Sequence, residues 1–373
     1  MQRAIYMDWN ATAPVRPEAA RAVLSALESC GNPSSVHGFG RNARKLMEEA
    51  RIKLASRVGA KVENVIFTSG GTEANLLALA SRGERRLVVS AIEHDSVLKP
   101  ALAAGAAVIQ VDRNGVVNLD HLRFLLTQDA RPALVSLMLA NNETGVVQPV
   151  ADAAEIAHAH GALLHCDAAQ ALGRINVDLA GLGADLLTAS GHKFGAPQGV
   201  GVLVTNGAPV SALLFGGGQE RSRRAGTENV PAIAGFGAAV ATIDLAASAH
   251  VAVLRSALEH RLLDCDPAIT VFGRDAARLP NTLCFAAGGE KSAETLVMAL
   301  DLAGIAVSAG SACSSGKVRP SHVVTAMGFD ATKAGTALRV SLGGANTESD
   351  IDAFMAAWKR IQAPTATQIQ PAA

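Results

Sequence analysis

The sequence predicts an α/β protein: a large domain with a mostly parallel β-sheet covered by helices, joined to a smaller α+β domain. Three observations predict this fold class. Short apolar or β-branched runs alternate with longer helical stretches rich in Ala and Leu through most of the chain. The central runs are continuously apolar, as expected for parallel strands that are buried on both faces. After about residue 250 the pattern changes to one long helix and shorter strands.

The elements follow in order along the chain. Strand–helix–strand repeats favour parallel pairing, and helical patterns such as 72–81 and 150–160 separate most of the predicted strands. The second part adds a helix over 250–264, strands over 281–286 and 337–341, and a closing helix over 349–361. The seven strands predicted for the large domain cover 65–68, 86–90, 107–111, 133–139, 162–167, 186–190 and 201–204.

These elements suggest domain boundaries. We expect residues 14–250 to form the large domain and residues 1–13 and 251–361 to form the small domain. Residues 362–373 (QAPTATQIQPAA without an apolar pattern) are expected to be a flexible tail.

Composition limits the classes of function. The 373 residues include 33 Lys and Arg against 33 Asp and Glu, and 3% are aromatic, which argues against a nucleic-acid partner. A hydrophobic content of 49% excludes a disordered chain. Five scattered cysteines without a CxxC pair indicate a reducing compartment. Without a signal-peptide pattern or a long apolar run, we expect a cytoplasmic protein with no membrane partner.

Residues 68–75 (TSGGTEAN) follow a predicted strand and open a predicted helix. Free N–H groups at a helix start bind phosphate, and the two glycines allow a close approach. The segment matches neither GxGxxG nor the P-loop pattern, so dinucleotide and nucleoside triphosphate sites are disfavoured. An ordinary glycine-rich turn is the alternative interpretation.

Two further segments end predicted strands with a charged residue. Asp167 lies at the carboxyl edge of its strand, where ligands bind in open α/β sheets; capping the next helix is the alternative. Lys193 follows the strand over 186–190 among small residues, and a desolvated lysine forms imines readily; a solvated loop lysine is the alternative. A phosphate cradle, a strand-end acid and an imine-forming lysine are together the parts that a pyridoxal 5'-phosphate (PLP) site requires.

In these segments the chain resembles the cysteine desulfurases of the NifS-like group, within the class V aminotransferase family of fold-type I PLP-dependent transferases. The resemblance covers nearly the whole chain and keeps the order of the family's motifs. It rests on DWNAT (8–12), GNPSSVH (31–37), SGGTEAN (69–75), EH (93–94), NNETG (141–145), DAAQ (167–170), HK (192–193), GGGQE (216–220), RAGTEN (224–229), GSACSS (310–315) and LRVS (338–341).

The resemblance implies a role for each matching residue. Lys193, His94 and Cys313 would be catalytic: Lys193 binds PLP as an imine and moves protons, and His94 stacks on the PLP ring. Arg339, Asn142 and Asn32 would bind the substrate, with the fork-shaped guanidinium on its carboxylate. Thr227 would reach the phosphate in a partner subunit, which implies a homodimer with shared active sites. The cofactor-binding residues would be Gly71, Thr72, Asn142, Asp167, Gln170, Ser190, His192, Lys193 and Thr227.

Cys313 would carry the chemistry specific to this group. By the resemblance, its thiolate attacks the sulfur of L-cysteine, L-alanine leaves, and a persulfide on Cys313 passes its sulfur to an acceptor protein for iron–sulfur clusters or another pathway. A small structural cysteine is the alternative for the residue. A selenocysteine lyase, a class V aminotransferase, or a catalytically silent sulfur carrier is the alternative for the protein. An aminotransferase has no need of the thiol.

Some positions depart from the family pattern. Gln198 stands where the family usually has Lys, Ser222 where Gly is common, and Arg174 where Lys is frequent.

His158 and His160, with the nearby His165 and Cys166, look like a metal cluster. Their spacing directs them to different faces of a helix and a strand, so we expect no metal.

Overall fold

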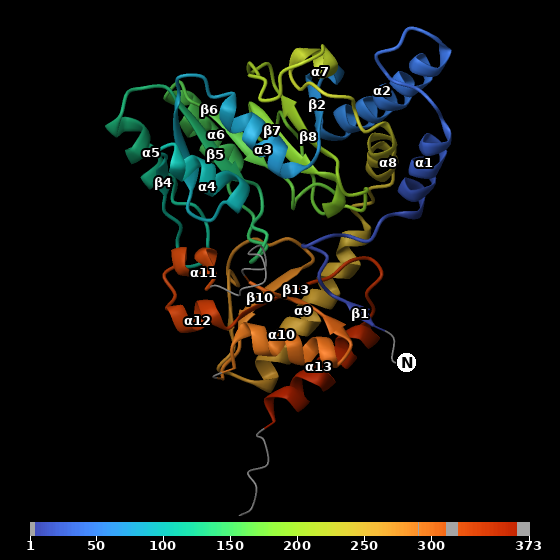
Figure 1. Ribbon diagram of the computed structural model, residues 1–373. Coiled ribbons are helices and arrows are strands. Elements are labelled where there is room, and N and C mark those ends of the chain that lie inside the picture. Colours follow the sequence, from blue (N-terminus) through green and yellow to red (C-terminus); the bar gives the residue numbers. More distant parts are fainter. Residues whose placement is uncertain (1–3, 290, 311–319, 364–373) are drawn as a thin grey trace, which may run out of the picture.

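The computed structural model describes residues 4–289, 291–310 and 320–363, which form two domains, one above the other in Figure 1. The larger contains a seven-stranded sheet in the order β2-β8-β7-β6-β5-β3-β4. Strands β3 to β7 pair in parallel, and β8 runs antiparallel to both of its neighbours. The strands are β2 (Val65–Thr68), β3 (Arg86–Ser90), β4 (Ala107–Ile109), β5 (Ala133–Met138), β6 (Leu163–Asp167), β7 (Leu186–Ser190) and β8 (Gly201–Thr205).

Helices cover both faces of this sheet because its strands are apolar on both sides. In β2, Ile66 packs with α3 and α4 on one face, while Val65 and Phe67 join the core on the other face with α2, α6 and α8. The Phe67 ring meets Phe236 of α8 edge to face. The helices are α1 (Pro17–Glu28), α2 (Gly38–Val58), α3 (Gly71–Ala80), α4 (Asp95–Ala103), α5 (Leu119–Gln128), α6 (Val150–Ala159), α7 (Gln219–Ser222) and α8 (Val230–Ala241).

The smaller domain is an antiparallel sheet, β12-β13-β10-β9, packed on helices around Trp358, Phe354 and Phe285. Its strands are β9 (Thr270–Val271), β10 (Thr282–Ala286), β12 (Ser308–Ala309) and β13 (Ala337–Ser341). A separate parallel pair joins β1 (Ile5–Tyr6) to β11 (Ile305–Ala306). The helices are α9 (Ala247–Cys265), α10 (Ala293–Leu302), α11 (His322–Ala326), α12 (Ala331–Gly335) and α13 (Glu348–Gln362).

The large sheet has a hydrophobic core on each face and the small domain has a core of its own, in keeping with the proposed division of the chain. The pairing of β1 with β11 ties the first residues to the small domain. The proposed boundary at residue 250 falls inside α9, which starts at Ala247, and α13 ends at Gln362, one residue later than expected. A smaller apolar cluster, which includes Ile92 and Met138 from the large domain and Phe272 and Cys284 from the small one, packs the domains together.

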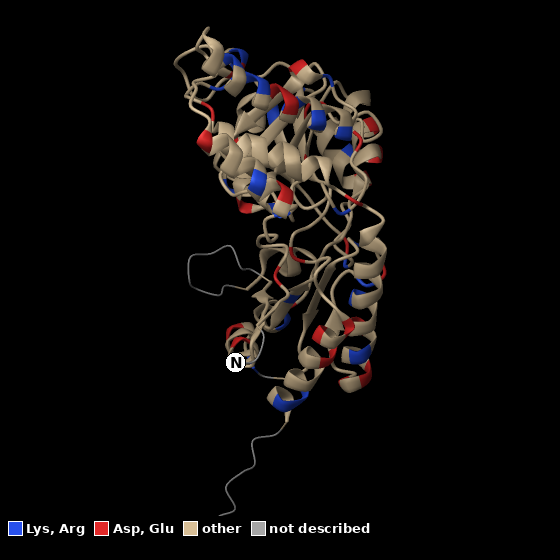
Figure 2. Cartoon of the chain, turned by 90° about the vertical axis from the view of Figure 1, so that its right-hand side faces the viewer, with Lys and Arg blue, Asp and Glu red and all other residues tan. Residues whose placement is uncertain are grey.

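Basic and acidic residues are interspersed over both domains in the view of Figure 2. None of the helices in the described part of the chain has both the length and the apolar composition that a bilayer span requires.

Candidate active site

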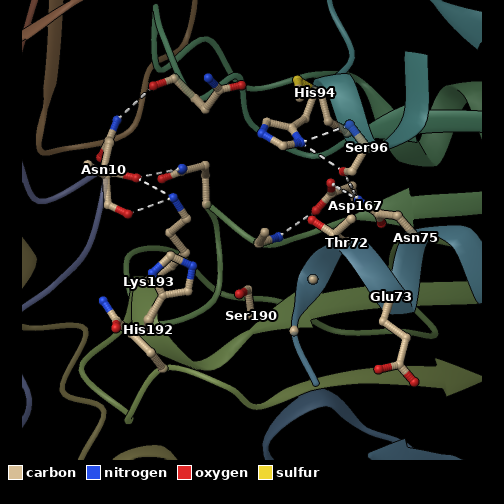
Figure 3. Close-up of a pocket in the computed structure, with 18 of the residues that line it drawn as sticks. Asn10, Thr72, Glu73, Asn75, His94, Ser96, Asp167, Ser190, His192 and Lys193 are labelled. Atoms are coloured by element: carbon tan, nitrogen blue, oxygen red, sulfur yellow. Dashed lines mark hydrogen bonds between the residues drawn. The ribbon is translucent and has the colours of Figure 1, made fainter. Parts of the chain in front are cut away.

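A cavity of about 570 Å³ lies where the carboxyl ends of the large-domain strands meet the small domain. Met138, Asp167 and Ser190 line it from the ends of β5, β6 and β7. Arg339 lines it from β13 of the small domain, and Asn10 from the segment after β1. The cavity therefore lies at the carboxyl edge of the parallel strands, where we expected a ligand to bind. Figure 3 shows a close-up of the pocket, with Asn10, Asp167 and Ser190 among the labelled side chains.

The start of α3 forms one wall of this cavity. Gly70 and Gly71 line the wall with Thr72, and the first N–H groups of a helix have no intrahelical acceptor. A Cβ on Gly71 would lie 3.1 Å from the Ser190 Cβ, so the glycine allows Ser190 to come close to the helix start. Across the edge of the sheet, a Cβ on Gly201 would lie 2.4 Å from the carbonyl carbon of Gly70. Two glycines thus keep this turn compact and its N–H groups open to an anion.

Asp167 presents a buried carboxylate to the same cavity. It is 5% exposed; its Oδ2 accepts a hydrogen bond from Asn75 Nδ2 at 2.8 Å, and its Oδ1 accepts one from the Ala169 N–H at 2.9 Å. Asn75 also donates to the Ser96 hydroxyl at 2.9 Å. These donors satisfy the ionised form of the carboxylate and fix its direction.

Lys193 lies in a 3₁₀ turn (Gly191–Lys193) directly after β7 and is half-buried, not fully buried as the sequence suggested. Its Nζ donates to the carbonyl oxygens of Asn10, at 2.6 Å, and Ala11, at 2.9 Å. Gln170 Nε2 donates to the same Asn10 oxygen at 3.1 Å. Backbone carbonyls of the small-domain segment therefore hold the ammonium at the wall of the cavity, opposite Asp167 in Figure 3.

His94 caps α4 and faces the cavity. Its Nδ1 accepts a hydrogen bond from the Ser96 N–H at 3.1 Å and lies 2.7 Å from the Ser96 hydroxyl. Burial lowers the pKa of His94, which favours the neutral ring. Because Nδ1 accepts from a backbone N–H, the proton of the neutral ring is assigned to Nε2. For His192, burial and then the neighbouring Lys193 lower the pKa to about 4.

Arg339 is buried at the small-domain wall with its guanidinium held from two sides. Nη2 donates to Asp8 Oδ1 at 2.8 Å, and Nη1 donates to the Asn142 carbonyl oxygen at 3.1 Å. Its Nε is buried without a hydrogen-bond partner among the described residues. Asp8 is fixed in turn by the Ser308 hydroxyl, which donates to Oδ2 at 2.6 Å. The cavity thus has a carboxylate on one side and an oriented cation on another.

Most of the predicted site residues line this one cavity. They are Gly71, Thr72, His94, Asn142, Asp167, Gln170, Ser190, His192, Lys193 and Arg339. Asn32 and Thr227 do not line it in the single chain: both are exposed, and Asn32 Oδ1 accepts from the Ser34 N–H. Cys313 lies outside the described residues. Among the other cysteines, Cys166 and Cys284 are buried, which raises the pKa of both thiols, and none of the four lines the cavity.

Sequence reasoning gave no role to several residues that organise the cavity. Asn10 acts through its backbone oxygen, which no side-chain pattern announces. Asn75 lies within one helical turn of the glycine turn, and Ser96 lies within one turn of His94. This closeness in the sequence was the available signal for both. Arg174 was noted only as a departure; its Nη1 donates to Gln170 Oε1 at 2.7 Å, and burial lowers its pKa to about 9.

The histidines that resemble a metal cluster have partners within the chain. His158 Nε2 lies 2.9 Å from Asp185 Oδ2, and His160 Nδ1 lies 2.8 Å from the Ile156 carbonyl oxygen. His165 bridges Ser136 and Thr188 in the core. Within the described ranges, no group of three or more His, Cys, Asp or Glu side chains is arranged to hold a metal ion.

Comparison with known proteins identifies the family. A model of the class-V aminotransferases matches residues 5–354. The chain belongs to the class-V aminotransferase family. Within this family, it is 43% identical to a cysteine desulfurase of Cereibacter sphaeroides over 94% of each chain. It is 38% identical to the cysteine desulfurase IscS of Dictyoglomus turgidum, over 97% of this chain and 95% of the relative.

A solved structure of a NifS-like protein from Rickettsia africae superposes with a TM-score of 0.90 at 36% identity, covering 96% of this chain and 99% of the other. These similarities confirm the predicted family, the NifS-like group, the fold class and the expectation of an enzyme.

Proposed function

We propose that the protein is a PLP-dependent cysteine desulfurase that converts L-cysteine to L-alanine and forms a persulfide on Cys313. The observation that carries the proposal is the convergence of Lys193, Asp167, the glycine turn before α3 and Arg339 on one cavity. The activity is also the one named for relatives about 40% identical over nearly the whole chain. Each of these groups would bind one part of the substrate or of PLP.

The donor set fits PLP. The buried, hydrogen-bonded carboxylate of Asp167 suits a protonated ring nitrogen, since a buried carboxylate needs donors or a cation. The phosphate would bind at Gly71 and Thr72, with Ser190 and His192 as further donors, in a cradle that a Cβ at position 71 would narrow. Gln170 would donate to the phenolic oxygen and His94 would stack on the ring, while Asn142 would bind beside it. PLP, when bound through Lys193, supplies an electron sink for the bond broken at the substrate Cα.

The protein's own residues carry out the remaining steps. Arg339 binds the substrate carboxylate and orients the amino acid, because Asp8 and the Asn142 carbonyl hold the guanidinium in one direction. Lys193 Nζ, freed from the cofactor, takes the Cα proton and later returns one to the product. The neutral His94 ring, with its proton on Nε2, donates a hydrogen bond beside the cofactor site.

Cys313 completes the reaction. Its thiolate attacks the substrate sulfur, the carbon–sulfur bond breaks, and a sulfur–sulfur bond forms on Cys313. The carbon left behind gains a proton, so that L-cysteine and a thiol give L-alanine and a persulfide, with no other oxidant or reductant. None of the described cysteines lines the cavity, which favours Cys313 for this role.

We further propose a cytoplasmic homodimer with shared active sites and a sulfur-acceptor protein as its partner. Thr227 is exposed and does not line the cavity itself; it lines a smaller pocket beside it, which shares Ser69, Gly199 and Val200 with the cavity. We assign it to the partner subunit's site on the resemblance to the family. Val36, Phe39 and Phe215 are 86%, 67% and 87% exposed, and large apolar side chains in this state favour burial against a second subunit. Asn32, exposed on the same loop as Val36, would meet substrate only in such a dimer.

The experiment uses purified protein incubated with PLP, L-cysteine and the reductant dithiothreitol, which releases the persulfide sulfur as sulfide, with alanine and sulfide measured. Wild type is expected to release both in equal amounts, and Cys313→Ser is expected to keep the cofactor absorbance but lose at least a hundredfold in sulfide release. Lys193→Ala is expected to lose the absorbance of covalently bound PLP. Equal sulfide release by wild type and Cys313→Ser would remove Cys313 from the reaction. Loss of the amino group from L-cysteine without sulfide release would favour an aminotransferase, and release of selenide from L-selenocysteine without sulfide from L-cysteine would favour a selenocysteine lyase.

A further inference from the structure

Outside the cavity, a buried pair of charges joins α2 to the short helix α7. Arg51 Nη2 donates to Glu220 Oε1 at 2.8 Å, and Arg51 Nη1 donates to Glu220 Oε2 at 2.9 Å. The two side chains are 5% and 1% exposed. A buried ion pair stabilises a fold only when geometry and further hydrogen bonds are good, and this pair has both.

The further bonds go to the free edge of the large sheet. Among the described strands, β2 is the last of the sheet and pairs with β8 alone. On its other edge, Arg51 donates to the Val65 carbonyl oxygen, and the Phe67 N–H donates to Glu220 Oε2 at 3.0 Å. Two residues further, the Ser69 N–H donates to Glu73 Oε2 at 2.8 Å. Charged side chains therefore take the place of a neighbouring strand along this edge.

The same acids hold the loop of residues 219–229. Arg224 Nε donates to Glu73 Oε1 at 2.8 Å, so the loop is attached at Glu220 and again at Arg224. Glu73 lines the cavity, but in Figure 3 its carboxylate points away from Asp167 and Lys193. We call Arg51, Glu220, Glu73 and Arg224 the edge ladder. In Figure 1, α7 lies above the end of the sheet, next to β2.

Between its two attachments the loop has a backbone that residues with a Cβ rarely adopt. Glu220, Arg221 and Ser222 have φ values of 45°, 57° and 63°, three left-handed residues in a row. Such strain persists only where the surroundings over-determine the conformation. The edge ladder supplies that constraint.

The loop leads to Thr227. Gly226 N–H donates to Gln219 Oε1 at 3.2 Å, which closes the loop on itself just before Thr227. We propose that the edge ladder is a set of positioning residues that holds Thr227 ready for the cofactor phosphate of the partner subunit. The inference rests on the proposed dimer with shared sites. It makes one claim that the dimer alone does not: the ladder of one subunit serves the other subunit's cofactor.

The first test is the dissociation constant of PLP from the apo homodimer, followed by cofactor absorbance. Glu220→Gln keeps the size and an acceptor for Phe67 but weakens the pair, and is expected to raise this constant at least tenfold. Glu48→Gln is the matched control, since Glu48 contacts Arg51 at 3.2 Å without touching the loop; a change below twofold is expected. Ser222→Gly added to Glu220→Gln is expected to recover part of the affinity, because glycine accepts the left-handed backbone. Arg224→Met removes the other, less buried attachment of the loop and is also expected to raise the dissociation constant of PLP. It serves as the second variant where Glu220→Gln folds poorly.

Mixed dimers decide whether the ladder acts on the partner. In a dimer of Lys193→Ala with Glu220→Gln, the one intact lysine faces an intact loop, and PLP fixed to Lys193 by borohydride is expected at the level of a Lys193→Ala/wild-type dimer. In a dimer of wild type with Lys193→Ala/Glu220→Gln, that level is expected to fall at least fivefold at subsaturating PLP. A defect that follows the subunit's own site, or an unchanged dissociation constant in both ladder variants, overturns the inference alone. Wild-type apo-protein that binds no PLP overturns the proposed function as well.

Discussion

Arg339 depends on Asp8 for its direction, because a guanidinium that faces a cavity has several ways to turn. The 2.8 Å bond to Asp8 and the 3.1 Å bond to the Asn142 carbonyl leave one orientation. A fork of two parallel donors matches a carboxylate better than the point charge of a lysine does. Substrate affinity should therefore depend on Asp8 as well as on Arg339.

Arg339→Lys is expected to raise the KM for L-cysteine about tenfold to a hundredfold, the loss of a bidentate charged hydrogen bond. Asp8→Asn is expected to raise it about threefold to tenfold with a smaller change in kcat. Ser308→Ala removes the hydrogen bond to the other Asp8 oxygen but leaves the arginine bond in place, so it is expected to raise the KM less than Asp8→Asn does. Steady-state kinetics measures all three, and an unchanged KM in Arg339→Lys would contradict the substrate role.

At this scale, the sequence identified residues whose side-chain chemistry is unusual for their position. Asp167 and Lys193 stood out because charged residues follow buried strands, and both line the cavity. Asn10 could not be found in this way, because its backbone oxygen makes the contact with Lys193 and Gln170. Its segment matched the family, but the match alone gave no chemical role.

Among the elements, the junction of β8 with the start of α3 has little spare room. A Cβ at Gly201 would lie 2.4 Å from backbone of Gly70, and backbone cannot rotate away as a side chain can. Gly70 itself has a φ of 164°, which is extended, and a Cβ there would meet nothing within 4 Å. Two neighbouring glycines thus differ in what a methyl group would cost.

Gly201→Ala is expected to lower the free energy of unfolding of the apo-protein by about 1–3 kcal/mol, because it overpacks a junction that cannot yield. Gly70→Ala is expected to change it by less than about 0.5 kcal/mol. Urea denaturation of the two apo variants measures the difference, and equal values would show that the turn moves freely. Displacement of the turn also predicts weaker PLP binding by Gly201→Ala.

The long elements were predictable because their patterns are local. The predicted strands 65–68, 86–90, 186–190 and 337–341 coincide with β2, β3, β7 and β13. The antiparallel direction of β8 was not predictable, since an apolar run is the same in both directions. The paired strands β1, β9, β11 and β12 have two residues each, too short for any periodicity to show.

For the whole molecule, the joint between the domains depends on residues 141–145. The Asn142 carbonyl accepts from Asn10 as well as Arg339, and a Cβ on Gly145 (φ 75°) would lie 2.6 Å from the Thr282 Cβ. This large-domain loop thus touches three segments of the small domain. The sequence showed the motif but not these contacts, because Asn10 and Arg339 lie 132 and 197 residues away from Asn142 along the chain.

Glu143 makes this joint sensitive to pH. Its carboxyl is buried at 3% exposure, and its Oε2 accepts from the Ser321 hydroxyl at 2.5 Å. Burial raises the pKa of Glu143 from 4.5 to about 7; Ser321 and Arg339 oppose this shift, and Asp95 adds to it. The folded state therefore binds a proton more tightly than the unfolded state does.

The sign follows from that difference. Below pH 4.5 Glu143 is protonated in both the folded and the unfolded state, so the stability that its bound proton contributes is fully present. This contribution is lost as the pH rises through about 7, where the carboxyl ionises in the folded state. The loss amounts to about 3 kcal/mol for a shift of this size. Glu143→Gln keeps an acceptor for Ser321 and cannot ionise. We expect it to unfold at higher denaturant than wild type at pH 8 and at nearly the same denaturant at pH 4.5. Glu155→Gln, on the exposed face of α6, should follow wild type at both values. Parallel curves for Glu143→Gln and wild type across this range would mean that Glu143 is ionised in the fold throughout, and that the joint between the domains holds a charge instead of a proton.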